Sequence, residues 1–144
     1  MSDITQILDS VAQNAERFIG LYYRTLDTRR NNIASMFEPS APIVYNGNPV
    51  VGGAAYAELY SQMPMTAHEV TGFDCHPLTA LGANGMPSIA LTTSGKVRIG
   101  NDVKKNLCGF SESLILRPQG NGRYLVSTAG YRILYVHPEY NIEP

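Results

Sequence analysis

The first third of the chain has the apolar spacing of helices. Apolar residues there recur mostly every three or four positions, which places them on one stripe of a long amphipathic helix. They are Ile4, Ile7, Leu8, Val11, Ala15, Phe18, Ile19, Tyr22 and Leu26. Two shorter helices are expected at about residues 33–37 and 56–63, ended by Pro39 and Pro64 respectively, because proline cannot continue a helix interior.

From His68 onward the pattern is that of strands. Four β-type segments, at about 68–77, 88–99, 107–117 and 123–136, are separated by turn clusters rich in Asn and Gly. Earlier, Asn46-Gly47 lies between two short β-type runs and predicts a hairpin. Long strands joined by short turns favour an antiparallel meander, and helices followed by strands are typical of the α+β class.

The helices are too few to cover both faces of such a sheet. One long and two short helices can cover one face, so the other face must meet water or another protein. Because no linker, repeat or low-complexity tract divides the sequence, we expect residues 1–144 to form a single domain.

Motifs in the helices, the hairpin and the strands, taken in this order, resemble those of one family. They are Phe18, Tyr22-Tyr23, Thr25, Asp27 and Arg29-Arg30 in and after the first helix, Tyr45-Asn46-Gly47-Asn48 and Val50 in the hairpin, Met63-Pro64 after the third helix, Phe73-Asp74-Cys75 and Pro77 in the first long strand, Phe110-Ser111 and Ser113-Leu114-Ile115-Leu116 in the third, and Tyr131-Arg132 in the last. The set is similar to the small subunit of the general messenger-RNA export receptor, in the nuclear transport factor 2-like family. Two positions depart from the family pattern: Tyr45 stands where Trp is frequent, and Glu112 where Gln is common.

The resemblance implies a fold and a function. The fold is a cone in which three helices pack on one face of a curved, mostly antiparallel sheet. The chain would be a non-catalytic subunit without cofactor that docks its open sheet face on the similarly folded domain of the large export receptor. The heterodimer would carry messenger ribonucleoprotein through the nuclear pore by binding phenylalanine-glycine nucleoporins, with RNA contacted weakly or indirectly. Its location would be the nucleus and the nuclear pore, with shuttling to the cytoplasm.

Composition agrees with a protein-binding role. Hydrophobic residues are 44% of the chain, charged residues only 16%, and the formal net charge is −1. A free-standing nucleic-acid binder is normally more basic. Apolar runs are too short for a membrane span, the N-terminus lacks the pattern of a signal peptide, and two cysteines make no disulfide framework. We therefore expect a soluble intracellular protein with no membrane contact.

An enzyme is one alternative, since the same cone fold holds dehydratases and isomerases. Such an enzyme needs an acid or base within reach of a substrate in the cone. The candidates are Asp74, His68, His76 and Tyr45. Asp74 and His76 share strand parity, but we expect both histidines to be solvated residues near strand ends. The sequence shows no metal-ligand cluster, phosphate loop or nucleophile elbow.

A second alternative is the homodimeric import carrier of the same fold, which binds a small GTPase. That carrier presents acidic residues from the hairpin and from the loop after the second long strand. Here the hairpin position is Asn46, and the loop at 101–105 contains Lys104 and Lys105. A GTPase surface that binds carboxylates would meet lysines here, which argues against this function.

The remaining basic, aromatic and sulfur-containing residues have structural interpretations. The end of the first helix is expected to carry Arg24, Arg29 and Arg30, and a solvated turn is expected to carry Lys104 and Lys105. The core is expected to contain Tyr22, Tyr56, Tyr60, Cys75 and Cys108. Basic residues suit a helix C-terminus. A minor contribution to RNA phosphate contacts is the alternative for the arginines and lysines.

Alternation along the last and third long strands predicts the interface. One face of the last strand carries Thr128, Gly130, Arg132, Leu134 and Val136, and the opposite face carries Tyr131, Ile133 and Tyr135. In the third long strand the outward residues are Ser111, Ser113 and Ile115, and the inward residues are Phe110, Leu114 and Leu116. The aromatic-rich set suits the core and the set with Arg132 the interface, and a β-bulge would reverse the assignment. The resemblance implies that Arg132 pairs with a carboxylate on the large subunit; otherwise it is a surface arginine whose stem lies over the sheet.

Overall fold

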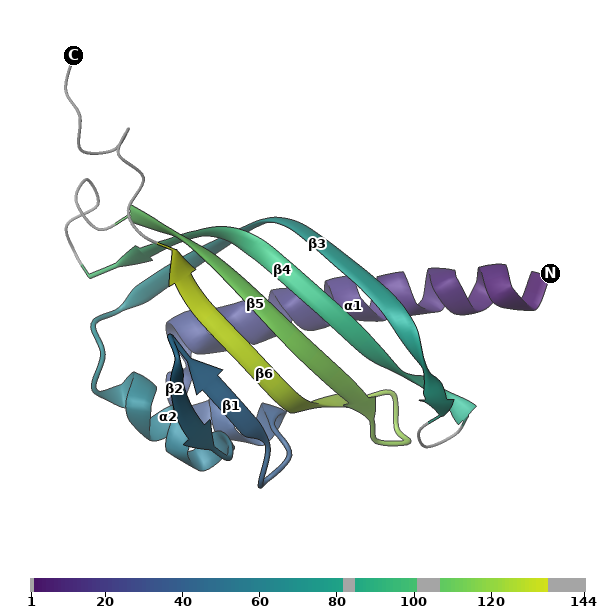
Figure 1. The fold of residues 1–144 in the computed structure, drawn as a ribbon, viewed down its shortest axis with the longest axis horizontal. Coiled ribbons are helices and arrows are strands. Elements are labelled where there is room, and N and C mark those ends of the chain that lie inside the picture. Colours follow the sequence, from purple (N-terminus) through teal and green to yellow (C-terminus); the bar gives the residue numbers. More distant parts are fainter. Residues whose placement is uncertain (1, 82–84, 101–106, 135–144) are drawn as a thin grey trace, which may run out of the picture.

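The helices precede the long strands along the chain, as the sequence predicts. The computed structural model describes residues 2–81, 85–100 and 107–134. Its elements are α1 (Ser2–Thr28), the 3₁₀ helix η1 (Arg30–Met36), β1 (Pro42–Tyr45), β2 (Asn48–Val51), α2 (Gly53–Ser61), β3 (Thr66–Leu81), β4 (Pro87–Ile99), β5 (Leu107–Pro118) and β6 (Tyr124–Leu134). The α+β class and the cone of helices on one sheet face are confirmed (Figure 1).

The six strands form one sheet in the order β2-β1-β6-β5-β4-β3. The four long strands are an antiparallel meander, and β1 and β2 form the predicted hairpin. Asn46 and Gly47 at its turn have φ values of 50° and 85°, the left-handed conformations that a two-residue hairpin turn requires. The hairpin joins the meander through a parallel pairing of β1 with β6, in which Ile43 is opposite Ala129.

Two bulges adjust the alternation of side chains. In β6 one extra residue, Ser127, lies between the pairs Ile115–Thr128 and Leu116–Val126. In β3 the register shifts between Val70 and Gly72. Opposite this second bulge a Cβ atom at Gly95 would overlap the backbone oxygen of Glu69, so this position requires glycine. Residues 128–134 of β6 keep the predicted alternation because the β6 bulge precedes them.

The core lies between α1, η1, α2 and the inner face of the sheet. Tyr22, Tyr56 and Tyr60 are each fully buried, as predicted. Cys75 and Cys108 are half-buried and pack against the edge of the core rather than within it, and burial raises the pKa of both thiols.

The N-terminal end of α1 departs from the prediction. Ile4, Ile7 and Leu8 have the spacing of a buried stripe but are 59%, 45% and 49% exposed. The helix extends beyond the edge of the sheet there (Figure 1), so these turns have little of the sheet to pack against. The buried stripe begins at Val11.

Arg30 has a different role from the one predicted. Its guanidinium donates hydrogen bonds to the backbone oxygens of Tyr60, Met63 and Pro64, and it lies 5.4 Å from the centre of the Tyr60 ring. It therefore satisfies carbonyls at the C-terminus of α2 rather than of α1. Arg24 and Arg29 are exposed, as expected, whereas Lys104 and Lys105 lie outside the described residues.

Candidate protein-binding face

The outer face of the sheet brings seven of the predicted interface residues together. Cross-strand pairs place Arg132 opposite Ser111, Gly130 opposite Ser113 and Thr128 opposite Ile115, with Leu134 at the end of β6. None of these seven side chains is buried, whereas Phe110, Leu114, Leu116 and Tyr131 on the inner face are. Tyr135 and Val136 lie outside the described residues.

Neighbouring strands extend this surface by residues that the sequence analysis missed. The pairing register continues from Ser113 to Thr92 on β4 and from Gly130 to Val44 on β1. Ala90 lies beside Ile115 in the next row. Strand parity in β4 could have found Thr92 and Ala90, but Val44 joins only through the parallel pairing of β1 with β6. We call this surface, from β3 to β1, the open face.

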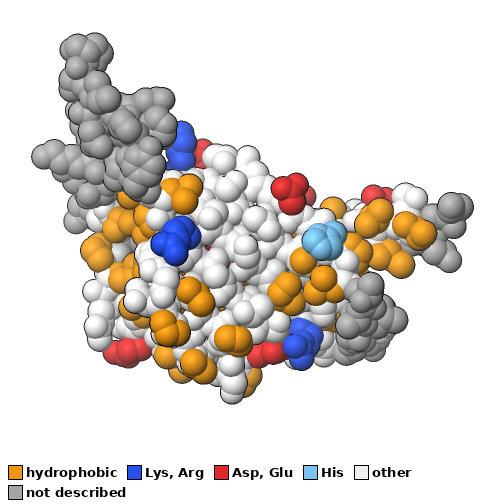
Figure 2. All heavy atoms as spheres, viewed as in Figure 1, with side chains coloured by type: hydrophobic (Ala, Val, Ile, Leu, Met, Phe, Trp, Pro, Cys, Tyr) orange, Lys and Arg blue, Asp and Glu red, His pale blue; other side chains and the backbone are white. Residues whose placement is uncertain are grey.

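The middle of the open face is made of small side chains. A shallow groove of about 360 Å³ lies over the small residues Ala90, Thr92, Ser113, Thr128 and Gly130. Larger apolar side chains flank it, including Val44, which is 46% exposed. In Figure 1 the long strands pass in front of α1, so the same view in Figure 2 looks onto this face: polar side chains and backbone fill its middle, and charged side chains are isolated. Its shape and low charge suit a protein partner whose bulky side chains enter the groove.

Arg132 is a charged residue of the open face near the hairpin. Its side chain is exposed, and a Cβ atom at Gly47 would lie 3.8 Å from its Nη2 atom. Within the described residues it has no carboxylate partner, since the two ion pairs found there join Asp27 with His68 and Glu38 with Arg117. The guanidinium is thus free to pair with a carboxylate from outside the described chain.

The inner face carries a buried polar cluster that the sequence analysis did not predict. Glu112 is 1% exposed, and its carboxylate accepts hydrogen bonds from the hydroxyls of Tyr22 at 2.9 Å and Tyr23 at 2.7 Å. The Tyr23 hydroxyl also lies 2.6 Å from the Thr93 hydroxyl. Burial raises the pKa of the Glu112 carboxyl from its usual 4.5 to about 7, although the two tyrosine hydrogen bonds counteract the shift.

His68 was expected to be solvated, and that prediction is wrong. Its side chain is fully buried between Asp27, whose carboxylate is 2.7 Å from Nδ1, and Tyr131, whose hydroxyl is 2.7 Å from Nε2. Asp27 also accepts hydrogen bonds from the Thr66 hydroxyl and the His68 backbone N–H. Although β3 is an edge strand, His68 points inward under the end of α1. The Asp27–His68–Tyr131 chain therefore connects α1, β3 and β6.

The four candidate catalytic residues do not form one site. Asp74 and His76 are exposed on the open-face side of β3, opposite Thr92 and Ala90. His68 and Tyr45 belong to the inner side, where Tyr45 stacks on Tyr131 with ring centres 5.4 Å apart. The sheet separates the two pairs, so they cannot share a substrate as an acid–base set.

The described residues contain no metal-binding cluster and no membrane-spanning helix. There, no group of three or more His, Cys, Asp or Glu side chains is placed to hold a metal ion. In the same part of the chain, no helix is long and apolar enough to cross a membrane.

Comparisons with known proteins place the chain in a family. The family described as "Nuclear pore RNA shuttling protein Mtr2" matches residues 9–133. NTF2-related export protein 2 of Bos taurus is 27% identical over 112 residues, which are 78% of this chain and 77% of that protein. Nuclear transport factor 2 of Oryza sativa subsp. japonica is 28% identical over 123 residues, 84% of this chain and 94% of that protein.

A solved structure agrees in fold. The Candida albicans Mtr2-Mex67 M domain complex contains a chain that superposes with a TM-score of 0.69 at 18% identity, covering 87% of this chain and 96% of that one. At this identity the likeness supports the cone fold alone. The match of the family over most of the sequence carries the assignment: the chain belongs to the Mtr2 family of nuclear pore RNA shuttling proteins.

Proposed function

We propose that the chain is a non-catalytic subunit that binds, through its open face, the similarly folded domain of a large messenger-RNA export receptor. The heterodimer supports export of messenger ribonucleoprotein through the nuclear pore, bound to phenylalanine-glycine nucleoporins, with RNA contacted weakly or indirectly. The subunit works in the nucleus and at the pore and shuttles to the cytoplasm. The related Candida albicans protein, crystallised with the M domain of Mex67, supports a partner of this type.

The observation that carries the proposal is the open face itself. No described element covers it, its middle is uncharged, and it combines a groove with an arginine that has no carboxylate partner among the described residues. We assign the interface to Ser111, Ser113, Ile115, Thr128, Gly130, Arg132 and Leu134. A stable complex on this surface should bury on the order of 1,600 Å² or more in total.

The homodimeric import carrier is the weaker proposal. At the hairpin position where that carrier presents a carboxylate, the Asn46 side-chain oxygen accepts a hydrogen bond from the Ile133 N–H at 2.7 Å. This residue ties the hairpin to β6 and offers no charge to a GTPase. Light scattering separates the two proposals: the chain alone should self-associate weakly, and the large receptor's domain should give a one-to-one complex.

Substitution of Arg132 tests the proposed interface. Once the face is covered, an arginine and its carboxylate partner are buried together, and removal of one partner costs roughly 3–5 kcal/mol. Arg132→Ala should therefore weaken the heterodimer by at least a hundredfold, and Arg132→Asp by more, because two carboxylates would then meet. Calorimetric titration against the large subunit's domain measures both.

Arg24→Ala is the matched control, because Arg24 is an exposed arginine on α1, across the sheet from the open face. It should bind like the wild type. Wild-type affinity of both Arg132 variants would show that the open face is not the interface.

A further inference from the structure

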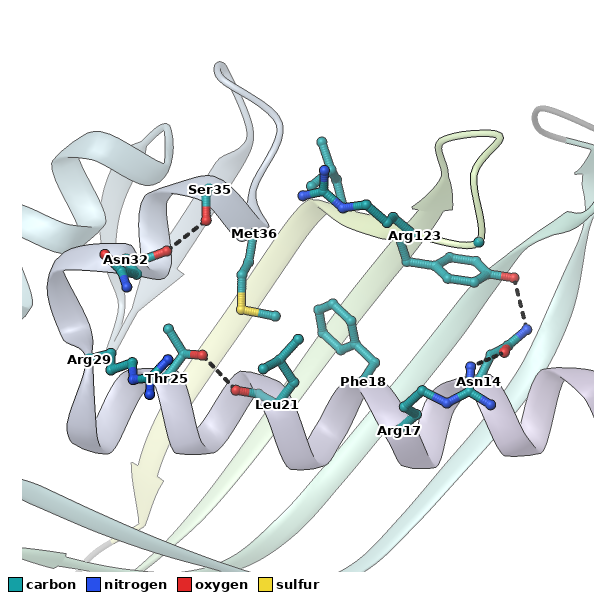
Figure 3. Close-up of a pocket in the computed structure, with 13 residues that line it drawn as sticks. Asn14, Arg17, Phe18, Leu21, Thr25, Arg29, Asn32, Ser35, Met36 and Arg123 are labelled. Carbon is teal, nitrogen blue, oxygen red and sulfur yellow. Dashed lines mark hydrogen bonds between the residues drawn. The ribbon is translucent and has the colours of Figure 1, made fainter.

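A second groove lies away from the open face, between α1, η1 and the turn that joins β5 to β6. Its volume is about 340 Å³, and three arginines surround it: Arg17, Arg29 and Arg123. Figure 3 shows Arg17 in the middle of α1, Arg29 just after the C-terminal end of α1, and Arg123 across the groove, in the turn. We call this site the arginine groove.

The charges around the arginine groove are all of one sign. Among the described residues, no acidic side chain lines it. Within the described residues none of the three guanidinium groups forms an ion pair, because the pairs found there involve other residues. Arg17 donates to the Asn14 side-chain oxygen at 3.2 Å, and the Asn14 amide donates to the Tyr124 hydroxyl at 3.4 Å, which helps to orient the guanidinium. The groove therefore offers uncompensated positive charge to an anionic ligand.

The floor of the arginine groove is apolar. Phe18, Leu21 and Met36 line its middle, and Leu21 is 52% exposed. Arg29 is twelve positions after Arg17, a distance of about 18 Å along a helix axis. An extended peptide covers this length with about five residues.

We propose that the arginine groove binds a short acidic segment of a partner protein, with carboxylates at the arginines and one large apolar side chain between them. Arginine pairs carboxylates bidentately, and the exposed part of Leu21 gives the apolar side chain a contact. The groove does not overlap the open face, so the segment can bind while that face is occupied.

Single-stranded RNA fits the site less well. Sequence-tolerant RNA binding relies on exposed aromatic rings on which bases stack. The aromatic residues of this groove are Phe18, which is only 7% exposed, and Tyr124, which is half-buried with its hydroxyl already bonded. The most exposed apolar side chain of the floor is the aliphatic Leu21, which suits a protein side chain better than a base.

Selection from a display library of random eight-residue peptides tests the proposal. The full-length chain is the bait, and peptides that also bind the triple variant Arg17→Gln/Arg29→Gln/Arg123→Gln are removed. We expect the remaining peptides to carry Asp or Glu on both sides of a Leu, Ile, Met or Phe. Fluorescence anisotropy of one such peptide should show about two- to fivefold weaker binding for each single arginine variant and more than tenfold for the triple variant.

Two further variants separate the explanations. Arg24→Gln changes an exposed arginine of α1 that does not line the groove and should leave peptide affinity unchanged. Leu21→Ser should weaken the peptide about fivefold but not a labelled ten-nucleotide oligouridylate. The proposal is overturned if no acidic peptide survives the subtraction, if Arg24→Gln weakens binding as much as Arg17→Gln, or if the oligouridylate binds more tightly than the peptide.

Discussion

The two faces of the sheet use the same strands for different purposes. Along β5, Phe110, Glu112, Leu114 and Leu116 point inward and are buried, while Ser111, Ser113 and Ile115 point outward. The inner face is crowded with aromatic rings, such as Phe110 and Tyr131 stacked 5.6 Å apart, and its buried Glu112 and His68 side chains are hydrogen-bonded. In the middle of the outer face the side chains are small and uncharged, and no described element covers them. Alternate residues of one strand therefore contribute either to folding or to binding. Substitutions of neighbouring residues should separate the effect on stability from the effect on affinity.

Adjacent aliphatic residues of β5 give the sharpest form of this comparison. Leu114→Ala removes a side chain that is 2% exposed and should lower the free energy of unfolding by about 2–5 kcal/mol, because a cavity remains in the core. Ile115→Ala should cost about 1 kcal/mol in the isolated chain, since this side chain is only half-buried. Urea denaturation measures both values.

Binding should rank the same two variants in the opposite order. At a temperature where both are folded, Ile115→Ala should weaken the heterodimer more than Leu114→Ala does. Equal losses of stability, or a stronger effect of Leu114 on binding, would contradict the division between the faces.

The buried carboxyl of the inner face should make stability depend on pH. The pKa of Glu112 is about 7 in the folded chain, above its usual 4.5, so the folded state holds this proton over a range where the unfolded state has lost it. The stability from this group is therefore complete below pH 4.5 and is lost as pH rises through 7, by about 3 kcal/mol in total.

Glu112→Gln is the control for this dependence. The amide keeps the volume and can accept from one tyrosine hydroxyl and donate to the other, but it does not titrate. Denaturation between pH 5 and 8 should show the wild type losing stability relative to the variant. Parallel curves for the two proteins would mean that Glu112 is ionised throughout.

The smallest effect is expected at Asp74, at the far side of the open face from Arg132. Because its side chain is exposed, Asp74→Asn should change the free energy of unfolding by less than about 0.5 kcal/mol. It should affect heterodimer affinity far less than Arg132→Ala and leave messenger-RNA export intact, which an export assay in cells measures. Turnover of a small molecule that depends on Asp74 would overturn the non-catalytic proposal.

Local pattern was sufficient to predict most of the elements and the sides of β5 and β6. Apolar spacing located α1, Asn46-Gly47 located the hairpin, and alternation placed Ser113 outward. The position of the bulge at Ser127 was not predicted, because Ser127 and its neighbours Val126 and Thr128 are residues that a regular strand also contains.

Contacts between residues far apart in the chain explain the failures. His68 and Glu112 are buried because Asp27, Tyr131, Tyr22 and Tyr23 supply hydrogen bonds from other elements, and no neighbour in the sequence reveals those partners. The three arginines of the arginine groove come from α1, the residue after it and the β5–β6 turn, so their proximity also emerges only in the folded chain.

The parallel pairing of β1 with β6 has a consequence for how the protein is made. The hairpin is synthesised early, yet its neighbour in the sheet is the last described strand, and the Thr128 hydroxyl that bonds the Pro42 carbonyl is 86 residues away in the chain. Pairings this distant close late and slow folding. A ribosome-bound chain that has not yet exposed β6 therefore holds α1, the hairpin and α2 without Val126 or Tyr131 to complete their core. The strand that closes the sheet is made after all the other described strands. Premature termination before β6 should therefore leave a product for proteolysis rather than a shorter folded protein.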